Sequence, residues 1–338
     1  ALDHFAGQGL AVGGVSRRAP QGEVGWEHLA VDLMDRDHAR EGLTAAEDTT
    51  RLVFAAYIER LYAARQIGPH DTQLRNTLDE LRDAGAPLQH VTLYQGHKFY
   101  GSHLGKFKVP AKESHRRLIA PNFYHAQEDL LRERAASDGF TLTIFRPEAV
   151  IGYAQGTPMN LLMAIAAYVS ITRELDIPLR FPGVHETYDQ IFYQVSDAAL
   201  LAEATRWGGE TPAAWGEAFN LTNGDIFHWS EIFRAIAEHY DMPYEDPQPM
   251  QLAEHMPLHR DLWERMREQY GLVSGPYESV VDWRFGDMIF NSTWDNVSST
   301  IKVRKAGFAS CHDSASRFIE LLDDLISRRI IPPLAADR

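Results

Sequence analysis

The chain has 338 residues, of which 44% are hydrophobic, and a formal net charge of −14 at pH 7. This length allows a large α/β domain and a smaller second domain, and the hydrophobic content excludes a disordered chain. The acidic balance argues against nucleic-acid or anionic-membrane partners, because both need many cationic side chains. The single cysteine, Cys311, excludes an intramolecular disulfide and favours a reducing compartment, so we expect a cytoplasmic protein.

Short apolar runs alternate with helical stretches over residues 1–152. Helical stretches are predicted near 58–84 and 122–138. This alternation is typical of a parallel sheet with crossover helices, and it predicts an α/β, doubly wound Rossmann-type dinucleotide-binding domain. The apolar runs are LAVGGVSRR (10–18), LAVDL (29–33), RLVFAAY (51–57), HVTLYQG (90–96) and LTIFRP (142–147).

Residues 153–338 have a different texture, with long helices and Pro-containing loops. We predict a smaller, mainly helical C-terminal lobe that binds substrate, with some later segments returning to the first domain. Helices are expected near 229–240 and 314–328. The apolar run from Met159 to Ile171 falls short of the roughly 20 residues that span a bilayer, so it is interpreted as a buried helix.

The N-terminal stretch ALDHFAGQG reads as the end of an amphipathic helix stopped by Gly7 and Gly9. A Gly-rich phosphate loop belongs between the first strand and the first helix of a dinucleotide-binding domain. The only glycine pair nearby, Gly13 and Gly14, lies inside a predicted strand. We therefore expect that the domain's first strand and its Gly-rich loop precede Ala1.

Ser16, Arg17 and Arg18 follow this predicted strand directly. Arginines at this place favour NADP(H), because a guanidinium matches the 2′-phosphate of the cofactor. The alternative interpretation is that the two arginines are solvated residues of a turn. Asp32, with the backbone of Leu33, stands at the end of the next strand and is predicted to meet the adenine edge.

Tyr124 is the candidate proton donor of a reworked catalytic set. Short-chain dehydrogenases of the extended type usually carry Y-x-x-x-K on a long helix, where the lysine lowers the pKa of the tyrosine. Here the residue four after Tyr124 is Glu128, which we interpret, together with Asp129, as a solvated helix face. Lys98, just after a predicted strand, offers a substitute cation.

Several segments resemble the progesterone 5β-reductase/iridoid synthase-like family of atypical short-chain dehydrogenases. The resemblance covers Gly9 to Pro333. Three segments carry most of it, and three later stretches support it. The six are GHKFYG (96–101), NFYHAQED (122–129), FRPEAVIG (145–152), LRFPG (179–183), FNLTNGDIFHW (219–229) and WRFGD (283–287).

The resemblance implies an NADPH-dependent reductase of the activated C=C bond of an enone or enal, with Tyr124 and Lys98 as catalytic residues that also contact the cofactor. It further implies a homodimer, a nicotinamide lined by Pro147, Val150 and Ile151, and substrate walls that include Tyr57 and Phe285. The chain departs from the family pattern at four positions that shape the pocket: Tyr57, Phe99, His125 and Phe145.

Two other functions stay open. A carbonyl reductase or alcohol dehydrogenase would use the same lysine and tyrosine on a C=O bond, and a dinucleotide-sensing regulator would need no positioned tyrosine. A metal site is not expected. His255 and His259 have helical spacing, but Pro257 between them disrupts a helical presentation.

Overall fold

The computed structural model describes residues 2–20, 23–58, 65–118, 122–154 and 159–334. The chain forms two compact units. The first comprises residues 1–147, 199–221 and 299–309, and the second comprises residues 148–198, 222–298 and 310–338. The chain thus leaves the first unit after Pro147 and returns to it twice.

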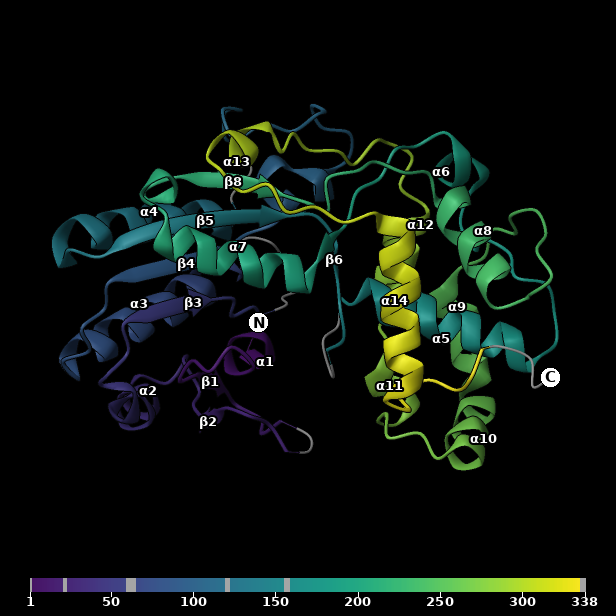
Figure 1. The fold of residues 1–338 in the computed structure, drawn as a ribbon, viewed down its shortest axis with the longest axis horizontal. Coiled ribbons are helices and arrows are strands. Elements are labelled where there is room, and N and C mark those ends of the chain that lie inside the picture. The colour runs from purple at the N-terminus through teal and green to yellow at the C-terminus, as the bar shows by residue number, and fades with distance from the viewer. Residues whose placement is uncertain (1, 21–22, 59–64, 119–121, 155–158, 335–338) are drawn as a thin grey trace. The chain divides into compact units, whose positions relative to one another are not determined.

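Parallel strands form the centre of the first unit (Figure 1). Four of them pair in the order β3 (Arg51–Phe54), β4 (His90–Tyr94), β5 (Thr141–Pro147) and β8 (Ala218–Leu221). Leu93 stands opposite Ile144 in this sheet, and Ile144 opposite Ala218. The carboxyl ends of β4 and β5 therefore meet at one edge, where ligands of open α/β sheets bind.

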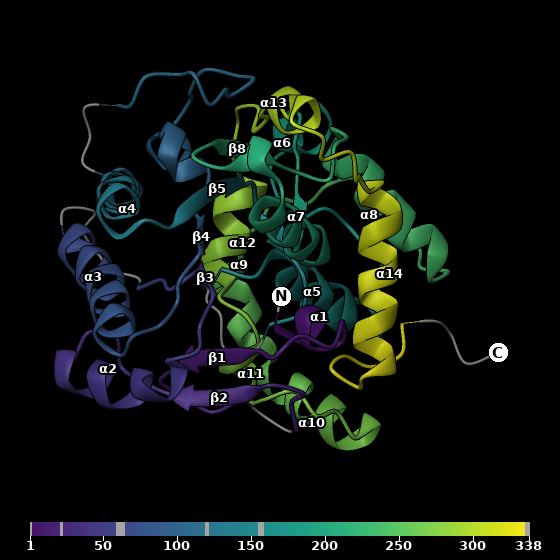
Figure 2. The same ribbon diagram turned by 60° about the vertical axis from the view of Figure 1, so that its left-hand side comes forward.

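Two further strands of the first unit, β1 (Gly13–Ser16) and β2 (Glu27–Ala30), pair in parallel as a separate sheet, which Figure 2 shows beside helix α2 (Arg36–Leu43). Val31 and Leu43 nevertheless belong to the same apolar core as Phe54 of β3. One core therefore connects both sheets.

Helices cover both faces of the four-stranded sheet. On one face, Leu142 and Ile144 of β5 share a core with the helices α3 (Ile67–Asp83) and α4 (Phe123–Asp138). On the other, Phe145 packs with residues of α7 (Ala198–Glu210). Successive strand residues point to opposite faces, so a run that is apolar at almost every position fits a sheet covered on both sides. The predicted doubly wound fold is confirmed.

The predicted elements of the first unit are found with shifted ends. Helix α1 (Leu2–Ala6) ends before Gly7, and Gly9 adopts a positive φ of 77°, as predicted for a glycine-terminated helix. The helix expected from residue 58 begins only at Ile67, and residues 59–64 lie outside the described part of the chain. Helix α13 (Ile301–Lys305) belongs to the last returning segment.

The second unit is mainly helical, as the sequence predicts. Its longest apolar run forms α5 (Leu161–Glu174), in which every residue from Leu161 to Thr172 is buried. Around it pack aromatic side chains such as Trp229 and Phe290. The other elements are β6 (Val150–Ile151), α6 (His185–Asp189), β7 (Ser196–Asp197), α8 (Trp229–His239), α9 (Leu252–His255), α10 (Arg260–Tyr270), α11 (Tyr277–Val280), α12 (Trp283–Phe290) and α14 (Ser314–Ser327).

None of the described helices is long and apolar enough to cross a membrane.

Gly183, in the LRFPG stretch, lies against the backbone of α12. A Cβ atom at this position would overlap the carbonyl oxygen of Phe290. We expect Gly183→Ala to lower the free energy of unfolding by about 2–3 kcal/mol, the usual cost of overpacking. A thermal melt measures this loss. Gly13→Ala in β1, where a Cβ meets nothing within 4 Å, is the control and should be neutral or stabilising. Equal melting temperatures for both variants would contradict the prediction.

The stability of the first unit depends on pH through His90. Burial, assisted by the charge of Arg51, lowers its pKa to about 4. Between pH 6.5 and 4 the His90 imidazole binds a proton in the unfolded chain but not in the folded chain. The free energy of unfolding therefore falls as the pH falls through this window. The loss should reach about 2–3 kcal/mol. Denaturant unfolding at several pH values should show a shallower decline for His90→Gln than for the wild type, and parallel declines would refute this role.

Candidate active site

The loop after β4 carries Lys98 at the carboxyl edge of the sheet. Gly96 has an extended backbone, and residues His97–Tyr100 then form one turn of 3-10 helix that ends at Gly101, whose φ is 84°. A Cβ atom on Gly96 would lie 3.3 Å from the Tyr124 hydroxyl and 3.8 Å from the Pro147 carbonyl oxygen. The small residue at 96 thus lets the phenol approach the ends of β4 and β5.

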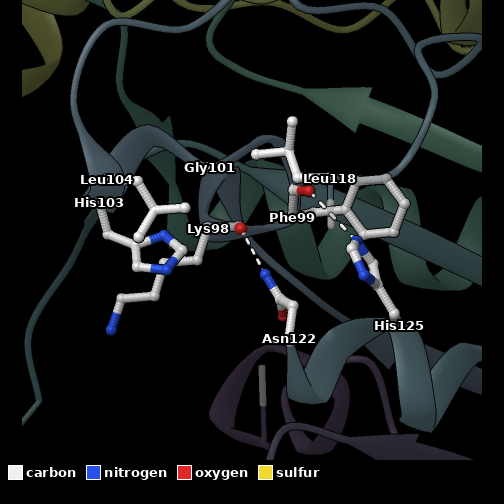
Figure 3. Close-up of a pocket in the computed structure, with 8 residues that line it drawn as sticks. All are labelled: Lys98, Phe99, Gly101, His103, Leu104, Leu118, Asn122 and His125. Carbon is white, nitrogen blue, oxygen red and sulfur yellow. Dashed lines mark hydrogen bonds between the residues drawn. The ribbon is translucent and has the colours of Figure 1, made fainter. Parts of the chain in front are cut away.

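Asn122 joins this loop to the start of α4. Its Oδ1 accepts a hydrogen bond from the backbone N–H of Tyr124 at 2.9 Å and thereby caps the helix. Its Nδ2 donates to the carbonyl oxygen of Lys98 at 2.5 Å (Figure 3). One side chain therefore fixes the backbones of both predicted catalytic residues.

Lys98 has a hydrogen-bonding partner in Tyr57. The Nζ atom donates to the Tyr57 hydroxyl oxygen at 3.0 Å and lies 5.3 Å from the centroid of that ring. The Tyr57 ring in turn contacts Phe123, with centroids 5.8 Å apart. A partly buried ammonium is costly unless it is paired, and the phenol at 57 accounts for part of this pairing.

A shallow pocket lies beside Lys98. Figure 3 shows that it combines apolar side chains with two imidazoles. Burial, and next the charge of Lys98, lowers the pKa of His103, and burial lowers the pKa of His125. Both rings are therefore neutral at pH 7. The pocket is lined by Lys98, Phe99, Gly101, His103, Leu104, Leu118, Asn122 and His125.

The residues predicted to bind the adenosine part of a cofactor lie around β1 and β2. Arg17 and Arg18 are exposed directly after β1. The Ser16 hydroxyl donates to the Arg18 carbonyl oxygen at 2.7 Å. Asp32 accepts from the N–H of Met34 at 2.9 Å, and Leu33 is buried. Two exposed guanidinium groups at a strand end are free of the packing that would prevent contact with a phosphate.

The other predicted contacts are divided between the two units. Pro147 ends β5 in the first unit. Val150 and Ile151 form β6 of the second unit, where Ile151 is buried and Val150 is 39% exposed. Phe285 lies in α12 and packs on the core of the second unit. The roles of Val150, Ile151 and Phe285 in binding stay predictions.

The interpretation of Glu128 as part of a solvated face is wrong. Glu128 is only 6% exposed, and its Oε2 accepts a hydrogen bond from Nη2 of Arg146 at 2.9 Å. Asp129, by contrast, has an exposed side chain. One signal in the sequence points to this pair, because an arginine inside the buried strand LTIFRP needs a carboxylate partner.

No group of three or more His, Cys, Asp and Glu side chains that could hold a metal ion occurs among the residues that the structure describes.

A parallel sheet with helices on both faces and its strand carboxyl ends at one edge defines a Rossmann-type fold. Residues 33–332 match the PRISE-like Rossmann-fold domain family. The chain belongs to this family, and as a member it is an oxidoreductase. The family predicted from the sequence is thus confirmed.

Two curated relatives illustrate the family. An (S)-8-oxocitronellyl enol synthase of Camptotheca acuminata is 30% identical over 317 residues, which cover 90% of this chain and 81% of the relative. A 3-oxo-Δ(4,5)-steroid 5-beta-reductase of Arabidopsis thaliana is 29% identical, with coverages of 90% and 81%.

Solved structures share the fold. A UDP-glucose 4-epimerase of Thermotoga maritima aligns with a TM-score of 0.66 at 13% identity and covers 96% of this chain and 94% of its own. A Pseudomonas aeruginosa protein solved with NADPH aligns with a TM-score of 0.60 at 14% identity, with coverages of 90% and 92%. At these identities the likeness concerns the fold alone.

Proposed function

We propose that this protein reduces the activated C=C bond of an enone or enal with NADPH. The observation that carries the proposal is the shared anchoring of Lys98 and Tyr124 by Asn122 at the carboxyl edge of the sheet. Support comes from two relatives whose names describe an enol synthase and a 3-oxo-steroid 5-beta-reductase. Both names concern compounds in which a carbonyl or enol is central.

The cofactor residues fit NADPH better than NADH. Arg17 and Arg18 are exposed at the end of β1, where the adenosine ribose binds in this fold. A guanidinium pair there suits a 2′-phosphate dianion, whereas an acidic side chain would favour the free 2′-hydroxyl of NADH. When bound, NADPH would supply the hydride.

The protein's own contribution is to stabilise the negative charge that develops on the substrate. As the β-carbon of an enone gains a hydride, negative charge develops on the carbonyl oxygen as an enolate. A proton from solvent at the α-carbon then gives the saturated carbonyl product. The Tyr124 hydroxyl is the proposed donor to this oxygen, and a single preorganised donor contributes about 3–4 kcal/mol to the transition state. The Lys98 ammonium adds positive potential, and its bond to Tyr57 keeps it in place.

Product analysis tests the proposal. Purified protein would be incubated with cyclohexenone, hexenal and a 3-oxo-Δ4,5-steroid, each with NADPH and with NADH, and the products identified by mass spectrometry. We expect saturated carbonyl products and faster turnover with NADPH. Allylic alcohols would instead establish a carbonyl reductase. Binding of NADPH without turnover of any compound would favour a sensing role.

A further inference from the structure

A buried ion pair lies directly behind the proposed active site. Arg146, near the end of β5, is 2% exposed, and Glu128 is 6% exposed. Glu128 stands four residues after Tyr124 on α4, so the two side chains are one helical turn apart. The mechanism described above uses neither charge.

Three arginines surround the Glu128 carboxylate. Arg146 donates to Oε2 at 2.9 Å, and Arg132 donates to Oε1 from Nε at 3.0 Å and from Nη2 at 2.9 Å. Arg117 lies 3.8 Å from Oε2. Burial alone raises the pKa of Glu128, but the charges of Arg146, Arg132 and Arg117 outweigh it and lower the pKa. The carboxylate therefore stays ionised and holds the buried guanidinium.

Gln95 connects this ion pair to Tyr124. Its Oε1 accepts from Nε of Arg146 at 2.8 Å, and its Nε2 donates to the backbone carbonyl oxygen of Tyr124 at 2.9 Å. Gln95 is itself 4% exposed, so water does not compete for these bonds. Gln95 therefore links the position of the Arg146 guanidinium to that of the first turn of α4.

Arg146 also contacts the loop that carries Lys98. Its Cζ atom lies 3.4 Å from the centroid of the Phe99 ring, and its Nη1 donates to the Tyr100 hydroxyl oxygen at 3.2 Å. Tyr100 continues the chain of bonds by donating to Oδ1 of Asn220 on β8 at 2.5 Å. One guanidinium group thus contacts the residue after Lys98 and, through Gln95, the backbone of Tyr124.

We propose that Arg146, Glu128 and Gln95 are positioning residues that hold Tyr124 and the Lys98 loop in the geometry required for reduction. The inference rests on the proposed function. It also explains the carboxylate at the place of the lysine in Y-x-x-x-K: Glu128 pairs with Arg146, while the catalytic cation comes from Lys98. A misplacement of about 1 Å in such a site can cost about 100-fold in rate.

Glu128→Gln tests the proposal, because it removes the charge with little change of shape. We expect kcat for cyclohexenone with NADPH to fall about 10- to 100-fold while KM for NADPH changes by less than about threefold. Asp129→Asn is the matched control, since it removes a carboxylate from the next position of the same helix, where the side chain is exposed and also pairs with Arg117. We expect it to keep wild-type kcat.

A double-mutant cycle with Tyr124→Phe separates positioning from general destabilisation. If Glu128 acts through Tyr124, Glu128→Gln should cost little in the Tyr124→Phe background. The same loss in both backgrounds would overturn the positioning of Tyr124, and wild-type kcat in Glu128→Gln would overturn the positioning role as a whole. Gln95→Leu keeps both charges but removes the hydrogen bonds that Gln95 makes to Glu128, Arg146 and the Tyr124 carbonyl. It serves in the same cycle and decides the question if Glu128→Gln does not fold. Wild-type protein that reduces none of the enones would instead refute the proposed function.

Discussion

Replacing Tyr124 by phenylalanine is expected to lower kcat for enone reduction by about 100- to 1000-fold, the usual cost of removing one oxyanion donor. The substitution removes only the hydroxyl group. The ring contact with Phe123, at a centroid distance of 4.1 Å, can remain. We therefore expect little change in thermal stability and in NADPH affinity, which fluorescence titration would measure beside the kinetics.

Tyr94→Phe is the matched control for this variant. Tyr94 ends β4, but its hydroxyl donates to the Leu201 carbonyl oxygen at 3.0 Å and contacts Thr205, both on α7. Its hydroxyl therefore serves packing on the face covered by α7, and we expect its loss to change kcat less than about twofold. Undiminished NADPH oxidation by Tyr124→Phe across the enones would remove Tyr124 from the mechanism.

The sequence predicted the sheet and its two covered faces because strand runs that are buried on both sides have a clear signature. Every residue of β4 from His90 to Leu93 is buried, as is β5 from Leu142 to Pro147. Segment ends were less predictable. Gly68 and Pro69 lie in the first turn of α3, where proline is tolerated, whereas the sequence pattern predicts them inside a longer helix.

The Lys98 loop and Tyr124 could be found from motifs, but their partners could not. Tyr57 and Lys98 are 41 residues apart, and Gln95 and Arg146 are 51 apart, so only the sheet topology brings these side chains together. The burial of Glu128 is hard to predict for a related reason. A helix face that packs on a neighbouring strand through ion pairs has the same pattern of polar residues as a face exposed to water. Here only the buried position of Arg146 distinguishes the two cases.

Replacing Lys98 by methionine is expected to lower kcat/KM for enones about 10- to 100-fold, because the side chain keeps its length but the positive potential beside the developing enolate is lost. Lys106→Met, at an exposed position in the same loop, is the control and should retain activity.

A second readout does not depend on turnover. The charge of Lys98 is one cause of the lowered pKa of His103, so the His103 pKa should rise in Lys98→Met. NMR titration, with His103→Gln to assign the signal, would measure this rise. Intact activity in Lys98→Met would exclude the ammonium from catalysis, and an unshifted His103 pKa would contradict their proximity in the pocket.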